Sequence, residues 1–348
     1  MKKSITKGEV KVLGIDLAKQ SFQLHGVDEN EQLILKRKMT RQKLKEFIIQ
    51  LPPCLIGIEA CGGSHYWKRF FESGGHQVKI IAPQFVKPYV KSNKSDAIDA
   101  EAICEAVQRP GMRFVPGKSI EQQDQQSIHR IRSQLVARRT AQSNQIRGLL
   151  LEYGITIPQG IVYVRKYIPQ ILENAENELS HLFREVLQEL YEEIKHLDKR
   201  ILTLESKLES LSTQDEDCQR LLSIPGIGLL TATALIAAIG DVSVFKNGRE
   251  MAAWIGLVPR QHSTGGKPTL LGISKRGDSY LRTLLIHGGR SVVRTAGKHS
   301  DRKNNWVTEL AERRGNNIAS VAVANKNVRI AWAVLTHKTT YQAEPVVA

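Results

Sequence analysis

The stretch Val12-Leu13-Gly14-Ile15-Asp16 is a short, largely apolar run that ends in a carboxylate. A second run of the same kind, Leu55-Ile56-Gly57-Ile58-Glu59, occurs further along the chain. Both runs are bounded by polar, Gly or Pro residues, which is typical of buried strands in a sheet that helices cover. A charged residue at the end of such a strand lies at the rim of the sheet, so Asp16 and Glu59 are candidate functional residues.

The segments around these two runs predict the rest of an α/β domain. The elements follow one another as three strands, helix, strand, helix, strand and helix. The expected strands are 10–15, 21–27, 32–36, 55–58 and 77–82, and the second and third helices are 64–73 and about 95–106.

Two further carboxylates, Asp96 and Asp99, lie in Lys94-Ser95-Asp96-Ala97-Ile98-Asp99 at the start of that last helix. Residues at i and i+3 share one face of a helix. If the helix packs across the strand ends, these two side chains converge with Asp16 and Glu59. Such an arrangement is typical of RNase H-like nucleases.

Four carboxylates that lie close together raise one another's pKa unless a cation is present. Hard oxygen ligands suit Mg²⁺, and two such ions can stabilise the attacking and leaving oxygens of a phosphodiester. The pattern therefore predicts Mg²⁺ held by Asp16, Glu59, Asp96 and Asp99. The alternative is that Asp96 only caps its helix and that the acidic residues follow the apolar runs by chance.

The charge of the chain favours a polyanionic partner. Its 348 residues include 50 Lys and Arg against 35 Asp and Glu, a formal net charge of +15. The excess is uneven, because residues 173–217 hold 13 acidic and 5 basic side chains. Two basic regions thus flank an acidic middle, as expected of a protein that binds nucleic acid.

The cysteines and the hydropathy exclude other classes of protein. The four cysteines have no pairwise metal-binding spacing, so no zinc site is expected and reduced thiols are the default. The N-terminus has no signal-peptide core, and the longest apolar stretch, Leu229–Ile239, is too short to span a bilayer. We expect a soluble, intracellular protein with no membrane contact.

A heptad-like pattern fills the acidic middle of the chain. One extra residue between Leu190 and Ile194 interrupts it, and the pattern predicts a coiled coil that dimerises the protein. The preceding helix, about Glu121 to Glu152, is basic and Gln-rich, and its Arg130, Arg138 and Arg139 are candidate nucleic-acid ligands. The alternative is a hairpin in which the acidic helix packs on the basic helix of the same chain. The apolar positions are Leu179, Phe183, Val186, Leu190, Ile194, Leu197, Ile201, Leu204, Leu208 and Leu211.

The turn Ile224-Pro225-Gly226-Ile227-Gly228 resembles a helix-hairpin-helix element, in which a tight turn offers backbone amides to a phosphate. Gly226 and Gly228 are therefore candidate nucleic-acid contacts, and a turn that only packs is the alternative. Beyond it, a Gly-rich loop carries two hydroxyls, Ser263 and Thr264, among many cations. Such a loop can bring a hydroxyl to a phosphate while cations stabilise the developing charge. The cations are Arg260, Lys267, Lys275, Arg276 and Arg282.

Over nearly its full length the chain resembles the DEDD transposases of bacterial insertion sequences, the group named after insertion sequence 110. The blocks that carry the resemblance are Gly14–Lys19, Ile58–Gly62, Asn93–Ala100, Ile224–Gly228 and Gly256–Arg260 through Arg282. The resemblance implies a RuvC-like domain, a coiled-coil dimerisation segment and a C-terminal domain with a nucleophilic serine. We expect boundaries at 1–115, 116–217 and 218–348, the last domain being mainly α-helical.

The resemblance also implies an RNA-guided DNA recombinase. A structured RNA from the element would pair with donor and target double-stranded DNA, and the serine would form a phosphoserine link to DNA without ATP. A homodimer, and a tetramer on DNA, would act in the bacterial cytoplasm at the nucleoid. The target and guide sequences do not follow from this chain.

The chain departs from the family's pattern at the nucleophile. Thr264 occupies the serine position, and Ser263 comes one residue earlier. The β-methyl of a threonine restricts its χ1 angle and crowds in-line attack, so chemistry favours Ser263 while position favours Thr264. Two other functions remain open: a RuvC-like nuclease or resolvase that uses water, and a non-enzymatic RNA- or DNA-binding factor.

Overall fold

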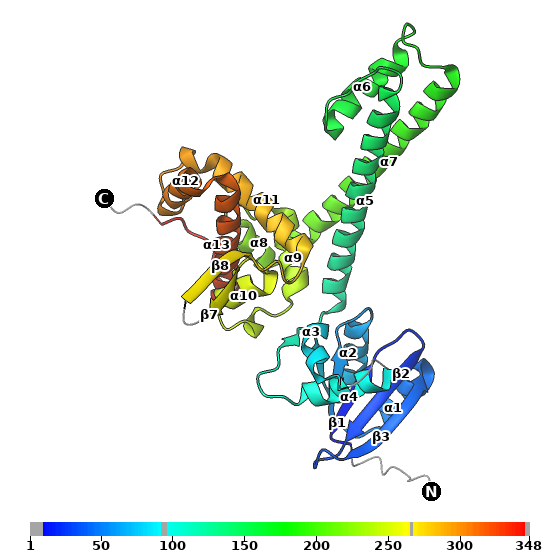
Figure 1. The fold of residues 1–348 in the computed structure, drawn as a ribbon, viewed down its shortest axis with the longest axis vertical. Helices are drawn as coiled ribbons and strands as arrows, with labels where there is room; N and C mark the ends of the chain where they lie inside the picture. Colours follow the sequence, from blue (N-terminus) through cyan, green and yellow to red (C-terminus); the bar gives the residue numbers. More distant parts are fainter. Residues whose placement is uncertain (1–9, 92–95, 265–266, 345–348) are drawn as a thin grey trace. The chain divides into compact units, whose positions relative to one another are not determined.

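The computed structural model describes residues 10–91, 96–264 and 267–344, except for the side chains of residues 264, 267 and 268. The chain forms two compact units, Met1–Ser119 and Ile120–Ala348 (Figure 1). Each unit is described by itself below.

The N-terminal unit is built on a six-stranded sheet with the order β3-β2-β1-β4-β5-β6. The first three strands form an antiparallel meander, β4 and β5 run parallel to β1, and the short β6 is antiparallel to β5. This mixed sheet, followed by a mostly helical C-terminal region, is compatible with the predicted RNase H-like fold. The strands are β1 (Val12–Asp16), β2 (Ser21–Val27), β3 (Leu33–Thr40), β4 (Leu55–Glu59), β5 (Gln77–Ile81) and β6 (Phe114–Val115).

Helices cover both faces of this sheet. On one face, α1 (Arg41–Gln50) and α2 (Ser64–Ser73) contribute Leu44, Trp67 and Phe71 to a core with the alternate residues of β1, β2 and β3. On the other face lies α4 (Asp96–Val107), preceded by the short α3 (Pro83–Val86) and the 3₁₀ turn η1 (Lys87–Tyr89). The predicted start of α4 at Ser95 lies outside the described residues.

Strand β3 is longer than the sequence predicts. The expected strand ends at Lys36, whereas the observed strand continues to Thr40. The sequence signal fails because three successive cations, Lys36, Arg37 and Lys38, hide the alternation of Leu35 and Met39, which are buried. Strand β3 lies at the edge of the sheet, where solvent accepts such side chains.

The second unit begins with a helical hairpin. Helix α5 (Ile120–Leu151) and helix α7 (His181–Gln214) pack along each other, and Arg132 binds Glu205 while Arg139 binds Asp198. As the residue number rises on α5 it falls on α7, so the helices are antiparallel. The acidic helix therefore pairs with the basic helix of its own chain, which is the alternative that the sequence left open.

The buried seam of α7 differs from the predicted one near both ends of the helix. Val186 and Leu211 are exposed, and Leu187 and Tyr191 are buried instead. The buried residues Leu187, Tyr191, Ile194, Leu197 and Ile201 lie three or four residues apart, so they form one stripe along α7.

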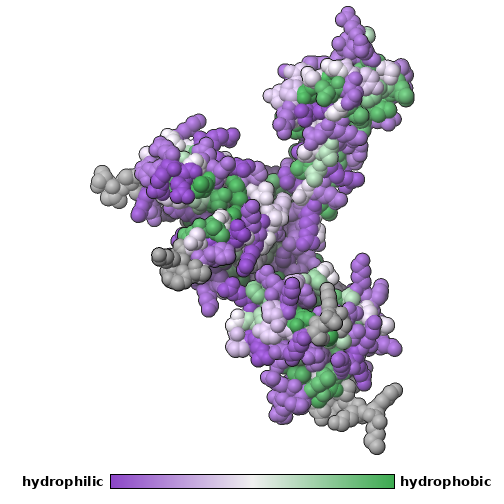
Figure 2. Space-filling view, viewed as in Figure 1, coloured by the Kyte–Doolittle hydropathy of each residue, from purple (hydrophilic) through white to green (hydrophobic). Residues whose placement is uncertain are grey.

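Helix α6 (Ile161–Glu173) folds back on the tip of the hairpin (Figure 1). Arg184 of α7 stabilises the end of α6, because its guanidinium donates to the carbonyl oxygens of Leu172 and Asn174 at 3.0 and 2.8 Å. Figure 2 shows apolar patches on this otherwise hydrophilic tip. The exposed apolar residues there are Leu151, Tyr153, Val162, Tyr163, Leu182 and Val186.

The rest of the second unit is a helical domain around α13, with one β-hairpin. Its core contains Leu235, Ile255, Leu281, Val328 and Leu335. The helices are α8 (Glu216–Leu222), α9 (Leu229–Ile239), α10 (Gly248–Ile255), α11 (Ser279–Thr295), α12 (Arg302–Arg314) and α13 (Asn316–His337), with 3₁₀ turns η2 (Val242–Val244) and η3 (Ala296–Lys298). The hairpin strands are β7 (Pro259–Thr264) and β8 (Lys267–Ile273).

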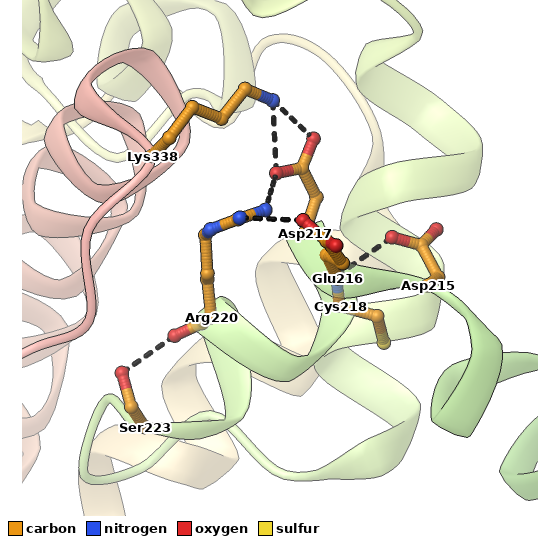
Figure 3. Close-up of polar contacts among 7 residues, drawn as sticks. All are labelled: Asp215, Glu216, Asp217, Cys218, Arg220, Ser223 and Lys338. Atoms are coloured by element: carbon orange, nitrogen blue, oxygen red, sulfur yellow. Dashed lines mark hydrogen bonds and ion pairs between the residues drawn. The ribbon is translucent and has the colours of Figure 1, made fainter.

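A small ionic cluster ties the end of α13 to α8 (Figure 3). Lys338 binds both carboxylate oxygens of Asp217 at 2.9 and 2.7 Å, and Arg220 binds Asp217 and Glu216. Asp215 caps α8 by accepting a hydrogen bond from the backbone N–H of Cys218. These contacts fasten the chain shortly before its C-terminal residues. Within the described ranges, no helix is both long and apolar enough to cross a bilayer.

Candidate nucleic-acid processing site

Asp16 and Glu59 lie side by side at the carboxyl ends of two parallel strands. Strands β1 and β4 pair in a register that sets Ile15 opposite Ile58, so the next residue on each strand is the carboxylate. Both carboxylates are half-buried and both take part in polar or electrostatic interactions. The strand ends thus place them at one edge of the sheet, as the sequence predicts.

Both carboxylates face the helix α4. A Cβ atom on Gly14 would lie 2.3 Å from the carbonyl oxygen of Ala100, and one on Gly57 would lie 2.9 Å from the Cβ of Val107. The two glycines therefore let α4 rest directly on the backbone of β1 and β4. Because side chains alternate along a strand, Asp16 and Glu59, two residues further on, point to the same face.

The direction of α4 brings its first turn toward this edge. Cys104 lies against the carbonyl oxygen of Val12 at 3.8 Å, whereas Ala100, one turn earlier, lies against Gly14. Moving toward the N-terminus of α4 thus means moving along β1 toward its carboxyl end. Asp96 and Asp99 belong to the first turn, the former exposed and the latter half-buried. The first turn of α4, which contains Asp96 and Asp99, therefore lies toward the strand ends that carry Asp16 and Glu59.

The pKa of the Cys61 thiol is affected by two of these carboxylates. Burial raises the pKa of its thiol, and the negative charges of Glu59 and Asp16 raise it further. The sulfur lies 4.0 Å from the carbonyl oxygen of Leu17, which follows Asp16. A neutral thiol of this kind neither competes for a proton with the carboxylates nor adds to their charge.

The donor chemistry at this edge fits Mg²⁺, because carboxylate oxygens on rigid strand and helix ends are its preferred protein ligands. The fit lies in residue type and placement. Among the described residues, no three His, Cys, Asp or Glu side chains are gathered closely enough to hold a metal ion. Binding a cation therefore requires these side chains to turn toward one another.

The predicted hydroxyl loop is a β-hairpin rather than an irregular loop. Ser263 is exposed near the end of β7, and the side-chain amide of Gln261 donates a hydrogen bond to its Oγ at 2.7 Å. The glycines of the tip, which suggested a loop, lie outside the described residues, as do the side chains of Thr264 and Lys267. The sequence missed the strands because β7 is polar after Pro259 and because Pro268 and Gly272 interrupt the apolar residues of β8.

The base of the hairpin is held by a close backbone contact at Gly256. Gly256 has φ +82°, and a Cβ there would lie 2.0 Å from the carbonyl oxygen of Arg276. Arg282 is half-buried and donates to the carbonyl oxygens of Ile255 and Arg276 at 3.1 and 3.2 Å. Its guanidinium stabilises the base of the hairpin, whereas the predicted nucleic-acid ligands Arg260, Lys275 and Arg276 are exposed.

The arginines predicted on α5 divide into two groups. Arg130 and Arg138 are exposed and available to a ligand. Arg139 is engaged within the chain, because its Nη1 binds Asp198 at 2.7 Å and its side chain is 20% exposed. The basic character of the helix thus serves partly to bind α7.

The Pro-Gly turn packs into the protein at Gly226 and is open at Gly228. A Cβ on Gly226, which has φ +90°, would meet Val292 at 2.7 Å, whereas one on Gly228 would meet nothing within 4 Å. Asn327 of α13 donates to the carbonyl oxygen of Pro225 at 2.9 Å. Gly226 is therefore required for packing against α11 and α13, which was the alternative to a phosphate contact.

The sequence does not reveal a polar network around His129. His129 of α5 is buried, and its ring nitrogens lie 3.0 Å from the hydroxyls of Tyr280 and Thr233. It borders a cavity of about 270 Å³ that Arg130 and Asp278 also line. No local signal marks this histidine, because its partners come from α9 and α11, far away in the sequence.

Comparison with known proteins assigns the family. Residues 218–304 match the family described as "Transposase IS116/IS110/IS902 family", and residues 13–155 match a DEDD transposase family of the IS110 type, described as "Transposase". The two matches cover the strand ends that carry Asp16 and Glu59, called the carboxylate edge below, and the β7–β8 hairpin.

Whole-length relatives agree with these matches. The chain is 50% identical to a "Probable family 20 transposase" of Pseudomonas aeruginosa, over 95% of this chain and 98% of the relative. It is 47% identical to the transposase for insertion sequence element IS1111A of Coxiella burnetii (96% and 92%) and 42% identical to that for IS1328 of Yersinia enterocolitica (95% and 98%). The chain therefore belongs to the IS110 family of transposases, enzymes that cut and recombine DNA.

Proposed function

We propose that this transposase is an RNA-guided DNA recombinase that cuts and rejoins DNA through a covalent link to a hydroxyl of the β7–β8 hairpin. The observation that carries the proposal is the placement of Asp16 and Glu59 side by side at the strand ends, on the face that α4 covers, with Asp96 and Asp99 in the first turn of that helix. In this proposal residues 1–115 form a RuvC-like catalytic domain. Residues 116–217 form the helical and nucleic-acid-binding segment, and residues 218–348 form the domain with the nucleophile.

The four carboxylates would hold Mg²⁺. When bound, the ion supplies positive charge to the scissile phosphate and so eases attack at phosphorus. The chain itself contributes rigid positions for the carboxylates, because two of them end paired strands and two start a helix. The backbone positions are thus fixed before the reaction, and only rotations of the side chains remain to be made when the ion binds.

The nucleophile in this proposal is Ser263, with Thr264 as the positional candidate. Gln261 donates to the Oγ of Ser263, which leaves the hydroxyl proton free to be transferred. The Oγ forms a bond to phosphorus, the bond from phosphorus to the 3′-oxygen breaks, and the departing oxygen takes up the proton. Religation is the reverse step, so the energy of the phosphodiester is conserved and no ATP is needed.

The exposed cations of the second unit are proposed to bind nucleic acid. Arg130 and Arg138 on α5 and Arg260, Lys275 and Arg276 around the hairpin are exposed. The partners would be double-stranded DNA from the element ends and target, and a structured RNA from the element that pairs with both. Lys267 and Gly228 are further candidates. Because the seam of α7 is filled by α5, a homodimer would use the exposed apolar tip of the hairpin, and a tetramer would form on DNA.

A trapping experiment tests the proposal. The protein is purified from cells that carry the whole element, the bound RNA is sequenced, and the complex is mixed with labelled element DNA and Mg²⁺. We expect an element-derived RNA and a protein–DNA adduct that survives denaturation. Asp16→Asn should lose cleavage and adduct together, whereas Asp124→Asn, at an exposed aspartate of α5, should retain both.

The second candidate is a RuvC-like nuclease that uses water, which the same carboxylates favour. It predicts cleavage that requires Asp16 but forms no adduct, and cleavage that persists in a Ser263→Ala/Thr264→Ala variant. Mixing that variant with Asp16→Ala chains tests assembly between protomers. If the mixture recovers no activity, a site shared between subunits loses its support.

A further inference from the structure

The carboxylate edge continues as a row of side chains across the sheet. The ladder between β1 and β2 pairs Asp16 with Gln23, and the ladder between β2 and β3 pairs Gln23 with Lys38. Side chains of directly paired residues project to the same face of a sheet. Lys38 therefore points to the face of α4, in the same row as Asp16 and two strands away from it.

A second row runs parallel to the first. Gly14 pairs with His25, and His25 pairs with Lys36, so Lys36 also points to the face that α4 partly covers. The surroundings of His25 agree with this direction. Burial lowers the pKa of His25, Glu101 of α4 raises it, and the positive charges of Lys36 and Lys91 lower it further. Lys36 and α4 thus act on one histidine from the same side of the sheet.

The side chains of Lys36 and Lys38 are exposed, and within the described part of the chain neither side chain forms a salt bridge or a hydrogen bond. Lys91 differs, because it binds Glu101 and Glu105. Strand β3 is an edge strand of the sheet (Figure 1). Two adjacent cations without an acidic partner form a surface for an anion.

The spacing relates these cations to a DNA strand held at the carboxylates. Neighbouring strands lie about 4.8 Å apart, which sets Lys38 about 10 Å from Asp16 along the row. Phosphates rise about 3.4 Å per nucleotide along one strand of a duplex. Because the strand also winds around the axis, the distance corresponds to at most about three nucleotides from a phosphate at Asp16, which is within the footprint of one bound strand.

We propose that Lys36 and Lys38 bind phosphates of the DNA strand that is cut at the carboxylate edge, a few nucleotides from the scissile bond. They are positioning residues, which fix the direction of the strand across β1, β2 and β3. The inference rests on the proposed function in one respect, that the cut occurs next to Asp16. It explains why the cations on the α4 face of β3 are unpaired.

The sheet offers a matched control. Arg37 lies between the two lysines but points to the opposite face, since it pairs with Leu24, which belongs to the core under α1 and α2. Lys43 is exposed on α1, which covers that same opposite face. The variants Lys36→Ala/Lys38→Ala and Arg37→Ala/Lys43→Ala thus each remove two positive charges, from opposite faces of the sheet.

The test measures binding of the RNA-loaded full-length protein to a fluorescein-labelled duplex of the element end by anisotropy, over a range of salt concentrations. Each lost phosphate contact lowers the slope of log K against log salt by about 0.9. We expect Lys36→Ala/Lys38→Ala to lower the slope by about 2, to weaken binding at least tenfold and to reduce cleavage. Arg37→Ala/Lys43→Ala should change the slope by less than half as much. Equal effects of the two variants, or no effect of either, would overturn the proposal.

Asp16→Asn separates this inference from the proposed function. If the carboxylates are not catalytic, Asp16→Asn still cuts DNA, whatever the lysine variants do. If only the lysine inference fails, Asp16→Asn loses cleavage while the two double variants bind alike. Thermal melting checks that each double variant folds like the wild-type protein, as expected for substitutions of exposed side chains.

Discussion

Arg139 and Asp198 form an ion pair across the α5–α7 hairpin, with Nη1 and Oδ1 2.7 Å apart, and Arg165 of α6 binds the second oxygen of the same carboxylate at 2.7 Å. One aspartate thus joins three helices. Burial raises the pKa of Asp198, but the hydrogen bonds from Arg165 and Arg139 outweigh it and hold the pKa below its ordinary value. The acidic charge of α7 is used to assemble the hairpin.

This ion pair predicts a stability that depends on pH. The unfolded pKa of an aspartate is about 3.9, so the contribution of Asp198 is fully present above about pH 4 and is lost as the pH falls through the lower, folded pKa. We expect Asp198→Asn to lower the free energy of unfolding by about 1–3 kcal/mol at neutral pH and by less near pH 3. Urea denaturation at both pH values measures this, with Asp124→Asn as the control. A loss of equal size at both pH values would contradict the expectation.

The Pro-Gly turn yields a matched pair of substitutions. Gly226→Ala places a Cβ 2.7 Å from Val292 in a backbone conformation with φ +90°, so we expect a loss of about 2–4 kcal/mol of stability. Gly228→Ala meets open space at an ordinary φ of −95°, and should cost less than about 1 kcal/mol. Thermal or urea denaturation measures the stability of the two variants. If both are equally stable, the turn does not need glycine for packing.

The local elements of the N-terminal unit were predictable, because buried strands and amphipathic helices leave periodic patterns. The prediction also placed Asp16 and Glu59 at strand ends, since the end of an apolar run is visible in the sequence. What the sequence hides are the partners. Whether α7 packs on α5 or on a second copy depends on contacts between distant residues such as Arg132 and Glu205.

Packing also decides roles that residue type leaves open. Arg282 has the charge of a phosphate ligand, yet it binds backbone carbonyls at the base of the hairpin. Gly226 has the context of an amide-donating turn, yet its neighbours are Val292 and Gly288. In both cases the local sequence fits two functions equally well. Only the three-dimensional contacts separate them.

His129 predicts a second dependence on pH, in a different range. Burial lowers its pKa to about 4, with a further contribution from the positive charge of Arg132. The unfolded pKa is about 6.5, so the unfolded state binds more protons between these values and stability falls as the pH drops from about 6.5 toward 4. We expect a linkage loss from His129 of about 2 kcal/mol on going from pH 7 to pH 5.

The variant His129→Gln isolates this contribution, since glutamine hydrogen-bonds like the neutral ring and does not titrate in this range. Its free energy of unfolding should fall less than that of the wild-type protein between the two pH values, as urea denaturation can measure. His196→Gln, at an exposed histidine of α7, should leave the pH profile unchanged. If His129→Gln and the wild type have parallel profiles, the buried ring does not cause the acid sensitivity.

The hydrogen bond from Gln261 to Ser263 gives the last prediction, which concerns the choice of nucleophile. If Ser263 attacks phosphorus, Ser263→Ala should lower adduct formation by at least about a thousandfold, because the attacking atom is lost. Gln261→Ala removes only a donor that orients the hydroxyl at 2.7 Å, and should lower the rate about tenfold without changing DNA affinity. The measurement is single-turnover adduct formation on labelled element DNA.

The opposing outcome is that Thr264, and not Ser263, attacks phosphorus. Its hydroxyl stays in place in Ser263→Ala, so an adduct that persists in this variant and disappears in Thr264→Ala would identify threonine as the nucleophile. In that case Thr264→Ser should accelerate attack, since removing the β-methyl frees the χ1 angle and opens the in-line path. If Ser263 is the nucleophile, Thr264→Ser should have little effect. The response to Gln261→Ala then separates the two further, because its amide contacts the oxygen of Ser263 alone among the hydroxyls that the structure describes on β7.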